Sequence, residues 1–331
     1  MNKQRNPLSP PSTHSSSDYH EARGVNKARK TKERKKTREI ERQKAILQDM
    51  PALVDAPAPR TNGAGPNGLE AVCRELKAKV DGFLDTPTDD KVLKSVKNQV
   101  IIARGVIEEA LRRYRPEELS LSYNGGKDCL VLLILLLASL PTSNIPPPPT
   151  TTTTTTTNSI STPSPPSFPH SLQALYIRPP LPFAEVDAFV ATSTARYHLD
   201  LTTSENAAMK PALTAYLAAR PAVRAVFVGT RRTDPHGAQL SFFDETDADW
   251  PRFMRVHPVI DWHYREVWAF IRALEIPYCK LYDMGYTSLG GTDDTHPNPA
   301  LKKEVAKTNG QSFRPAYELT EDNEERLGRD R

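Results

Sequence analysis

Residues 119–140 read LSLSYNGGKDCLVLLILLLASL and combine three kinds of local structure. Leu119 to Tyr123 is short, apolar and bounded by a turn, which predicts a buried strand. Asn124, Gly125 and Gly126 predict a tight turn, because glycine accepts a positive φ and lets a ligand approach the backbone. From about Asp128 the pattern predicts an apolar helix. A strand, a glycine turn and a helix N-terminus together form an anion site, because the first helical N–H groups lack partners.

The side chain of Lys127 adds a positive charge that suits a phosphate. The turn is not a Walker A loop, since G-x-x-x-x-G-K-[ST] is absent. A second glycine pattern, GAGPNG at 63–68, has dinucleotide-loop spacing, but the Pro/Ala-rich segment before it cannot form the strand that such a loop needs. From these residues alone, a chance Asn-Gly-Gly turn before a buried helix stays open as the alternative to phosphate binding.

Strand and helix patterns alternate after the central helix. Strands are predicted over 172–177, 198–202 and 223–229, and helices over 182–197 and 206–219. This alternation predicts an α/β fold with a doubly wound, mostly parallel sheet and helices on both faces. Ligands of such sheets lie beyond the carboxyl ends of the strands. Here those ends are Tyr123–Asn124 and Val228–Thr230.

Charge and composition divide the chain unevenly. Residues 1–60 hold 14 Lys and Arg against 7 Asp and Glu, whereas the whole chain holds 44 against 40, so the remainder is slightly acidic. We expect a disordered basic tail and linker over 1–68 and a folded domain over 69–331, with no nucleic acid bound by that domain. Residues 146–169 contain four consecutive prolines and eight consecutive threonines, which predicts a flexible low-complexity insert.

Three observations bear on location. The apolar run Leu130–Leu140 is too short to span a bilayer. No apolar signal segment follows the N-terminus. Cys73, Cys129 and Cys279 are far apart in the sequence, which fits a reducing compartment. We therefore expect a cytoplasmic protein without a membrane partner; mitochondrial and nuclear pools stay open.

A second glycine turn, FVGTRRTDP at 227–235, follows the last of these strands. Its two arginines suit a phosphate or a carboxylate, and Asp234 suits Mg²⁺, directly or through water. The alternative is a surface loop in which Arg and Asp pair with each other. Three aromatic residues follow this turn: Trp250, Phe253 and Trp262. They either pack against the planar ring of a ligand or belong to the core. Arg326 and Arg329 would share one face if the chain end were helical, and a charged tail is the alternative there.

Taken together, six segments resemble the eukaryotic, fungal-type FAD synthetases (FMN adenylyltransferases). They are SYNGGKDC (122–129), FVGTRRTDP (227–235), TDADWPRFMRV (246–256), PVIDWHYREVW (258–268), PYCKLYDMGYTSLGG (277–291) and ERLGR (325–329). The resemblance implies the fold of the PAPS-reductase-like ATP pyrophosphatases. It also implies transfer of AMP from Mg·ATP to the phosphate of FMN, giving FAD and pyrophosphate. Mg²⁺, ATP and FMN are then the small molecules bound.

The resemblance also implies roles for individual residues. For ATP these residues are Ser122, Tyr123, Asn124, Gly125, Gly126, Lys127, Tyr176, Ile177, Gly229, Arg231 and Arg232. For FMN they are Asp247, Trp250, Arg326 and Arg329. Asp128 and Asp234 are the expected Mg²⁺ residues, and the catalytic set comprises Asn124, Asp128, Asp234, Arg326 and Arg329. A monomer is expected, with transient contact to FAD-accepting apoproteins.

Two other enzyme classes on this fold remain as alternatives. A sulfonucleotide reductase needs a nucleophilic cysteine near the C-terminus, and no cysteine follows Cys279. An ATP-dependent tRNA-modifying enzyme usually has paired cysteines or an RNA-binding domain. A non-catalytic nucleotide-binding module is a third hypothesis. Charged residues in the two glycine turns and at the chain end argue against it: Lys127, Asp128, Asp234, Arg326 and Arg329.

Overall fold

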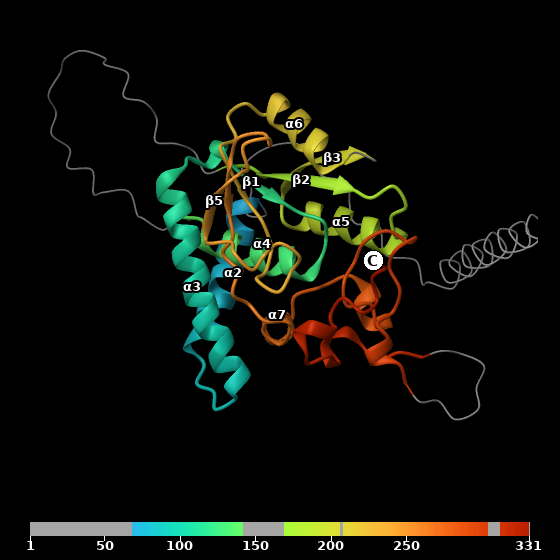
Figure 1. Ribbon diagram of the computed structural model, residues 1–331. Coiled ribbons are helices and arrows are strands. Elements are labelled where there is room, and N and C mark those ends of the chain that lie inside the picture. Colours follow the sequence, from blue (N-terminus) through green and yellow to red (C-terminus); the bar gives the residue numbers. More distant parts are fainter. Residues whose placement is uncertain (1–67, 142–168, 206–207, 304–311, 331) are drawn as a thin grey trace, which may run out of the picture. The chain divides into compact units, whose positions relative to one another are not determined.

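The computed structural model describes residues 68–141, 169–205, 208–303 and 312–330 (Figure 1). The predicted tail over 1–68 and the predicted insert over 146–169 lie almost wholly outside these ranges. The division of the chain at residue 69 therefore stays a prediction.

A six-stranded sheet forms the centre of the described part. Its order is β3-β2-β1-β4-β6-β5. The strands are β1 (Leu119–Ser122), β2 (Leu172–Arg178), β3 (Leu199–Glu205), β4 (Ala225–Phe227), β5 (Phe243–Glu245) and β6 (Met254–Val256). All neighbouring strands are parallel except β5, which is antiparallel to β6. The predicted doubly wound, mostly parallel α/β fold is confirmed. β5 and β6 had not been predicted, since three-residue strands carry too few residues to show alternation.

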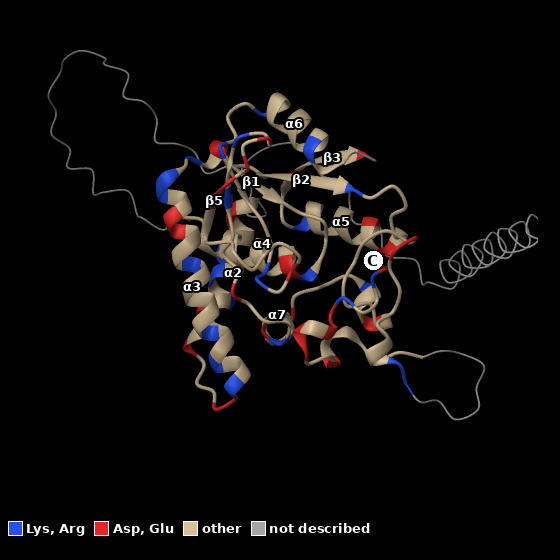
Figure 2. Ribbon diagram, viewed as in Figure 1, with Lys and Arg blue, Asp and Glu red and all other residues tan. Residues whose placement is uncertain are grey.

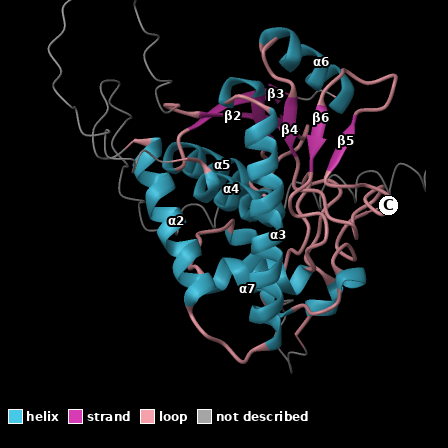
Figure 3. Ribbon diagram, turned by 90° about the vertical axis from the view of Figure 1, so that its left-hand side faces the viewer, coloured by secondary structure: helices cyan, strands magenta, loops and turns pink. Residues whose placement is uncertain are grey.

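The helices cover the two faces of this sheet unequally. The α-helices are α2 (Leu69–Asp85), α3 (Lys91–Arg113), α4 (Lys127–Ser139), α5 (Ala184–Arg196), α6 (Met209–Ala219) and α7 (Tyr264–Ala273). Residues of α2, α3, α4, α5 and α7 join one large apolar cluster with Leu121 and Phe227 of the sheet. Residues of α6 pack instead with Leu175 and Val226, which point to the opposite face. Figure 3 shows this division, with α6 on the far side of the sheet from α3 and α4.

Helix α4 is the core element around which the other helices pack. Every residue from Leu130 to Ala138 is buried, and α2, α3 and α7 contact this helix. A helix surrounded on all sides needs no polar face, which explains why its sequence is apolar throughout. Among the described residues, no helix has the length and apolar character required to cross a membrane.

Short 3₁₀ helices replace longer elements near the C-terminus. They are Lys280–Met284, Pro299–Leu301, Ala316–Glu318 and Asp322–Glu324, and one more, Pro116–Glu118, precedes β1. After Glu324 the chain forms turns up to Gly328. The arginines at 326 and 329 are therefore not on one helix face: Arg326 is exposed and Arg329 is half-buried. Basic and acidic residues are interspersed along the elements in view in Figure 2.

Candidate active site

The site lies where the order of strands reverses. β1 has β2 on one side and β4 on the other, and each is parallel to β1. The loops that follow β1 and β4 therefore leave the sheet at the same edge and in opposite directions, which is where open α/β sheets bind ligands. The two predicted glycine turns meet here. A Cβ atom added to Gly229 would lie 2.9 Å from the backbone nitrogen of Cys129 in α4.

The first glycine turn is held by its own side chain and backbone. Gly125 has a φ of +72°, a conformation that residues with a side chain rarely adopt. The side-chain oxygen of Asn124 accepts hydrogen bonds from the Gly126 amide at 2.9 Å and from the Cys129 thiol at 3.0 Å. The Lys127 amide donates to the Tyr282 hydroxyl at 2.8 Å. Gly126, the N-cap of α4, supplies no side-chain cap, so the start of this helix stays open for an anion.

A buried charge cluster, composed of Lys127, Asp128, Arg231 and Glu325, lies directly behind this turn. The Lys127 ammonium is 3.0 Å from Asp128 and 2.5 Å from Glu325. The Arg231 guanidinium is 2.8 Å from Asp128 and also pairs with Glu325. Lys127 is 2% exposed and Arg231 is 0% exposed, so solvent screens these pairs little.

Neighbouring charges hold three members of the buried charge cluster in their ionised forms: Asp128, Lys127 and Arg231. Burial alone would raise the pKa of Asp128, but the charges of Arg231 and Lys127 outweigh burial and hold this pKa below its ordinary value. Burial alone would lower the pKa of Lys127, but Asp128 and Glu325 raise it above its ordinary value. The pKa of Arg231 is raised for the same reason. All three side chains are therefore charged at neutral pH.

The C-terminal segment reaches this cluster by crossing the loop over 277–298. The carbonyl of Glu325 accepts a hydrogen bond from the Thr287 hydroxyl at 2.6 Å. The Asn298 amide group donates to the carbonyl of Glu324 at 2.8 Å. Asp322 accepts hydrogen bonds from the backbone of Tyr264 and from the His263 ring, both at 2.6 Å. Residues far apart in the sequence thus lie side by side, as the red and orange segments of Figure 1 show.

The two C-terminal arginines differ in how firmly they are held. Arg329 donates to the Leu289 carbonyl at 3.0 Å and to Asp294 at 2.7 Å, and its Nε has no hydrogen-bond partner. A Cβ on Gly290 would overlap its guanidinium group, so glycine is required for this arrangement. Arg326 is exposed, and its side chain forms no ion pair with any described residue. Arg326 is therefore the freer of the two to meet a ligand.

The second glycine turn brings Asp234 to the site but directs Arg232 elsewhere. Asp234 accepts a hydrogen bond from the Arg231 amide at 2.8 Å, which fixes its carboxylate beside the buried charge cluster. Arg232 instead pairs with Asp261 at 2.6 Å and donates to the carbonyls of Ala238 and Leu240. Its predicted phosphate contact stays a prediction.

Strand β2 offers free main-chain groups next to the turn. β1 pairs with β2 as far as Ser122 and Leu175, while β2 continues to Arg178. The carbonyl of Leu175 accepts from the Tyr123 amide at 2.9 Å, so it faces β1. Because backbone groups alternate along a strand, those of Ile177 face the same side, beyond the end of β1. Of the predicted adenine pair, Ile177 rather than Tyr176 has the open main chain, and the Tyr176 side chain is buried.

The predicted flavin residues Asp247 and Trp250 lie in the loop that joins β5 to β6. Asp247 is exposed and accepts the Trp250 amide with its carbonyl at 2.9 Å. Trp250 is half-buried and packs against the apolar cluster that α6 forms with Leu175 and Val226. Phe253 and Trp262 are buried in the core, so for these two the core reading is correct.

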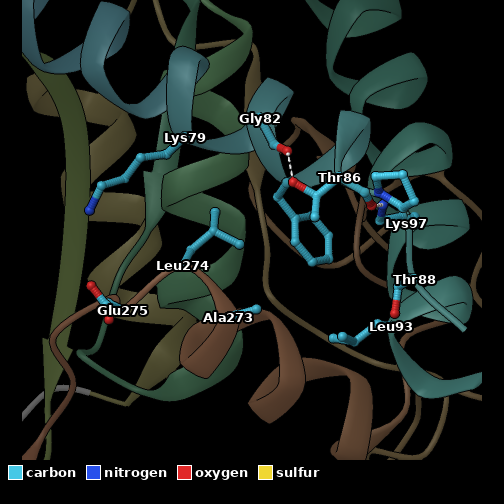
Figure 4. A pocket seen from close by; sticks show the side chains of 11 residues that line it. Lys79, Gly82, Thr86, Thr88, Leu93, Lys97, Ala273, Leu274 and Glu275 are labelled. Carbon is cyan, nitrogen blue, oxygen red and sulfur yellow. Dashed lines mark hydrogen bonds between the residues drawn. The ribbon is translucent and has the colours of Figure 1, made fainter. Parts of the chain in front are cut away.

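Two other kinds of site come into question in the described residues, a cluster of metal ligands and a separate cavity. Among the described residues no group of three or more His, Cys, Asp or Glu side chains could hold a metal ion. A cavity of about 470 Å³ lies between α2, α3 and the end of α7, lined by residues such as Phe83 and Leu274 (Figure 4). The ammonium of Lys97 in this cavity donates to the carbonyls of Leu84 and Thr86. These elements carry none of the predicted site residues.

Sequence reasoning missed three residues that shape the site: Glu325, Asp322 and Tyr282. Glu325 stands in a run of charged residues at the chain end, where acidic side chains are normally solvated. Only its burial between Lys127 and Arg231 distinguishes it. Tyr282 lies within a matching segment, but no sequence signal indicates that its hydroxyl accepts the Lys127 amide.

Comparison with known proteins agrees with this geometry. The phosphoadenosine phosphosulfate reductase domain family matches residues 118–297. A probable FAD synthase of Schizosaccharomyces pombe is 36% identical over 261 residues, which cover 79% of this chain and 88% of the relative. The flavin adenine dinucleotide synthase of Saccharomyces cerevisiae is 31% identical over 242 residues, or 70% of this chain and 76% of that protein. Candida glabrata FMN adenylyltransferase, solved with FAD and inorganic pyrophosphate, superimposes with a TM-score of 0.69 at 26% identity, covering 79% of this chain and 99% of that chain. The chain therefore belongs to the FAD synthase (FMN adenylyltransferase) family.

Proposed function

We propose that this protein is an FMN adenylyltransferase, which transfers AMP from ATP to the phosphate of FMN and releases pyrophosphate. The observation that carries the proposal is the meeting of the two glycine turns at the reversal of strand order, with the C-terminal arginine segment beside them. The relatives named above are FAD synthases, and the S. pombe protein aligns over 88% of its own length.

The reaction needs no general base. The nucleophile is a phosphate oxygen of FMN, which is ionised at neutral pH. It forms a bond to the α-phosphorus of ATP while the bond between that phosphorus and the α,β-bridging oxygen breaks, and pyrophosphate takes the electron pair. The protein has to align the two groups and to offset negative charge.

The proposed ATP site lies at the two glycine turns. The open start of α4 and the turn over 124–126 face the β- and γ-phosphates, and the free main chain of Ile177 suits the edge of adenine. FMN then lies toward Asp247 and Trp250, with its phosphate approaching Arg326 and Arg329. In this arrangement the leaving pyrophosphate stays at the glycine turns and the attacking group arrives from the opposite side.

Asp128 and Asp234 fit a magnesium ion. Both supply oxygen ligands held at Arg231: Oδ1 of Asp128 lies 2.8 Å from the Arg231 guanidinium, and the Asp234 carboxylate accepts the Arg231 amide. Mg²⁺ in such sites takes one or two carboxylates together with substrate phosphates. When bound, the ion would neutralise part of the phosphate charge. The two aspartates would orient it beside the start of α4.

A direct assay tests the proposed function. The purified chain is incubated with ATP, Mg²⁺ and FMN, and flavin fluorescence is followed, because FMN fluorescence falls as FAD forms. Chromatography identifies the product, and a reaction without ATP is the control. Constant fluorescence in the complete reaction would rule the activity out.

The reductase alternative finds no support in the cysteines. Cys279 is buried, and burial raises the pKa of its thiol to about 11. Such a thiol is almost wholly protonated at neutral pH and a poor nucleophile. Cys129 is similar, with a pKa raised to about 12 by burial.

We further propose a cytoplasmic monomer that hands FAD to apoproteins by transient contact. The exposed large apolar side chains are scattered over several elements, for example Ile101, Met209 and Leu327, which favours a monomer. Light scattering coupled to gel filtration measures the mass in solution, and a mass of two chains would contradict the monomer. Microscopy of a tagged chain tests the location.

A further inference from the structure

The proposed reaction assigns no function to Glu325, although its surroundings suggest one. Its carboxylate is almost fully buried and lies between two cations that come from different loops. Lys127 opens the helix after β1, and Arg231 belongs to the turn after β4. Glu325 itself belongs to the C-terminal segment. One side chain thus joins the two glycine turns and the chain end.

The formal charges of the buried charge cluster sum to zero. Lys127 and Arg231 contribute two positive charges, and Asp128 and Glu325 contribute two negative ones. Removal of one carboxylate would leave a buried cation without a full partner, which is unfavourable in a site screened from water. Both cations are therefore held toward Glu325.

Glu325 is also tied mechanically to the arginines that follow it. Backbone hydrogen bonds from Leu327 to Glu324 and from Arg329 to Arg326 close tight turns over this segment. Gly328 packs so closely on the carbonyl of His296 that a Cβ there would overlap it. A segment so constrained moves as a unit, so the position of the Glu325 carboxylate sets that of Arg326.

We propose that Glu325 is a positioning residue, which holds the C-terminal arginines in place against the two glycine turns by bridging Lys127 and Arg231. This inference rests on the proposed function for its effect on catalysis. It makes Lys127 and Arg231 anchors of the segment, acting on the reaction through Glu325. The FMN phosphate and ATP are then aligned because the Glu325 carboxylate connects the chain end, which binds FMN, to the glycine turns, which bind ATP.

The first test replaces Glu325 by its neutral isostere. In Glu325→Gln we expect kcat to fall about 10- to 100-fold, because displaced arginines no longer align the phosphates. KM for ATP should change less than about threefold, since the turn over 124–126 is intact. Glu324→Gln, at the half-exposed neighbour, is the matched control and should behave as the wild type. An unchanged kcat in Glu325→Gln would overturn the proposal.

A double-mutant cycle separates positioning from general support of the fold. If Glu325 acts through the C-terminal arginines, then Glu325→Gln should add little loss of kcat in a background that carries both Arg326→Ala and Arg329→Ala. Losses that multiply would mean that Glu325 acts independently of the arginines, and the proposal would be wrong. Should Glu325→Gln fail to fold, Glu325→Asp, which keeps the charge and shortens the side chain, takes its place in the cycle.

Hydrogen exchange tests the anchor without reference to activity. Amides of residues 322–330 should exchange at least about tenfold faster in Glu325→Gln than in the wild type or in Glu324→Gln. Unchanged exchange would overturn the anchoring even if the wild type makes FAD. If the wild type makes no FAD but exchange is still faster in Glu325→Gln, the proposed function would be overturned and the anchor retained.

Discussion

The two halves of the site differ in how completely the protein prepares them. On the ATP side, the turn over 124–126 is fixed by hydrogen bonds, Gly229 touches the backbone of α4, and four buried charges neutralise one another. On the FMN side, Asp247 and Arg326 are exposed and their side chains contact no described residue by an ion pair. The ATP half is built before ligand arrives, whereas the FMN half includes two exposed side chains, Asp247 and Arg326, beside the firmly held Arg329.

This difference follows from what each half must bind. A triphosphate brings several negative charges, and a rigid set of N–H donors binds it without reorganisation. The flavin phosphate must enter and the larger product must leave, which mobile side chains permit. We therefore expect substitutions on the ATP side to abolish the reaction. Substitutions of the exposed FMN-side residues, such as Asp247, should change the affinity for one substrate.

The largest effect is expected for Gly229→Val. The added Cβ would lie 2.9 Å from the Cys129 nitrogen and 3.1 Å from the Asp128 carbonyl carbon, and backbone atoms cannot move aside cheaply. Separation of the two turns should reduce kcat/KM for ATP by more than about 10³-fold, since even small misplacement costs about 10². Steady-state assays with ATP varied measure this loss.

The matched control is Gly105→Ala in α3. A Cβ at Gly105 would meet nothing within 4 Å, so turnover should be unchanged. Alanine also favours a helix over glycine, and the free energy of unfolding should rise by about 0.5–1 kcal/mol. Equal losses in the two variants would contradict the distinction between a site glycine and a helix glycine.

The next largest effect is expected for Arg329→Ala. A donor that stabilises developing phosphate charge is typically worth a factor of roughly 10²–10³ in kcat. Stopped-flow or steady-state measurement of FAD formation checks the loss, and near-normal turnover would remove Arg329 from the catalytic set. Gly290→Ala gives a gentler version, because the new Cβ displaces the guanidinium while the main chain stays in place. It should lower kcat without lowering the melting temperature.

The ATP side was also the better predicted from sequence. The strand, turn and helix over 119–140 were found because glycine and an unbroken apolar run each have a direct local meaning. One face of α3 follows helical spacing: Val96, Val100 and Ile107 on it are buried, and Val92 and Leu111 are half-buried. Glu325 could not be found this way, since its burial depends on contacts with residues 198 positions away in sequence. For the same reason the pairing of Arg232 with Asp261 was not foreseen.

A smaller, substrate-specific effect is expected for Asp247→Asn. The residue is exposed and supports no buried group, so the fold and the ATP site should be unaffected. Loss of one charged hydrogen bond to the flavin should raise KM for FMN by about tenfold and leave KM for ATP unchanged. Asp249→Asn in the same loop is the control, since Asp249 pairs at the surface with Lys210 at 3.0 Å. An equal change in both KM values would argue against a separate flavin side.

The smallest effect at neutral pH concerns His257, a buried base that contrasts with Lys127. Lys127 keeps its charge because two carboxylates contact it, whereas both ring nitrogens of His257 lack hydrogen-bond partners. Burial lowers the pKa of His257 from 6.5 to about 4. Between these values the unfolded chain binds a proton that the folded chain does not, so the free energy of unfolding falls as the pH is lowered. Urea denaturation should show a decrease of about 2 kcal/mol between pH 7 and pH 5 that His257→Phe lacks. His170 is exposed, so the control variant His170→Gln should retain this decrease. If the wild type and His257→Phe showed the same pH dependence, His257 would take up its proton in the folded chain as it does in the unfolded chain.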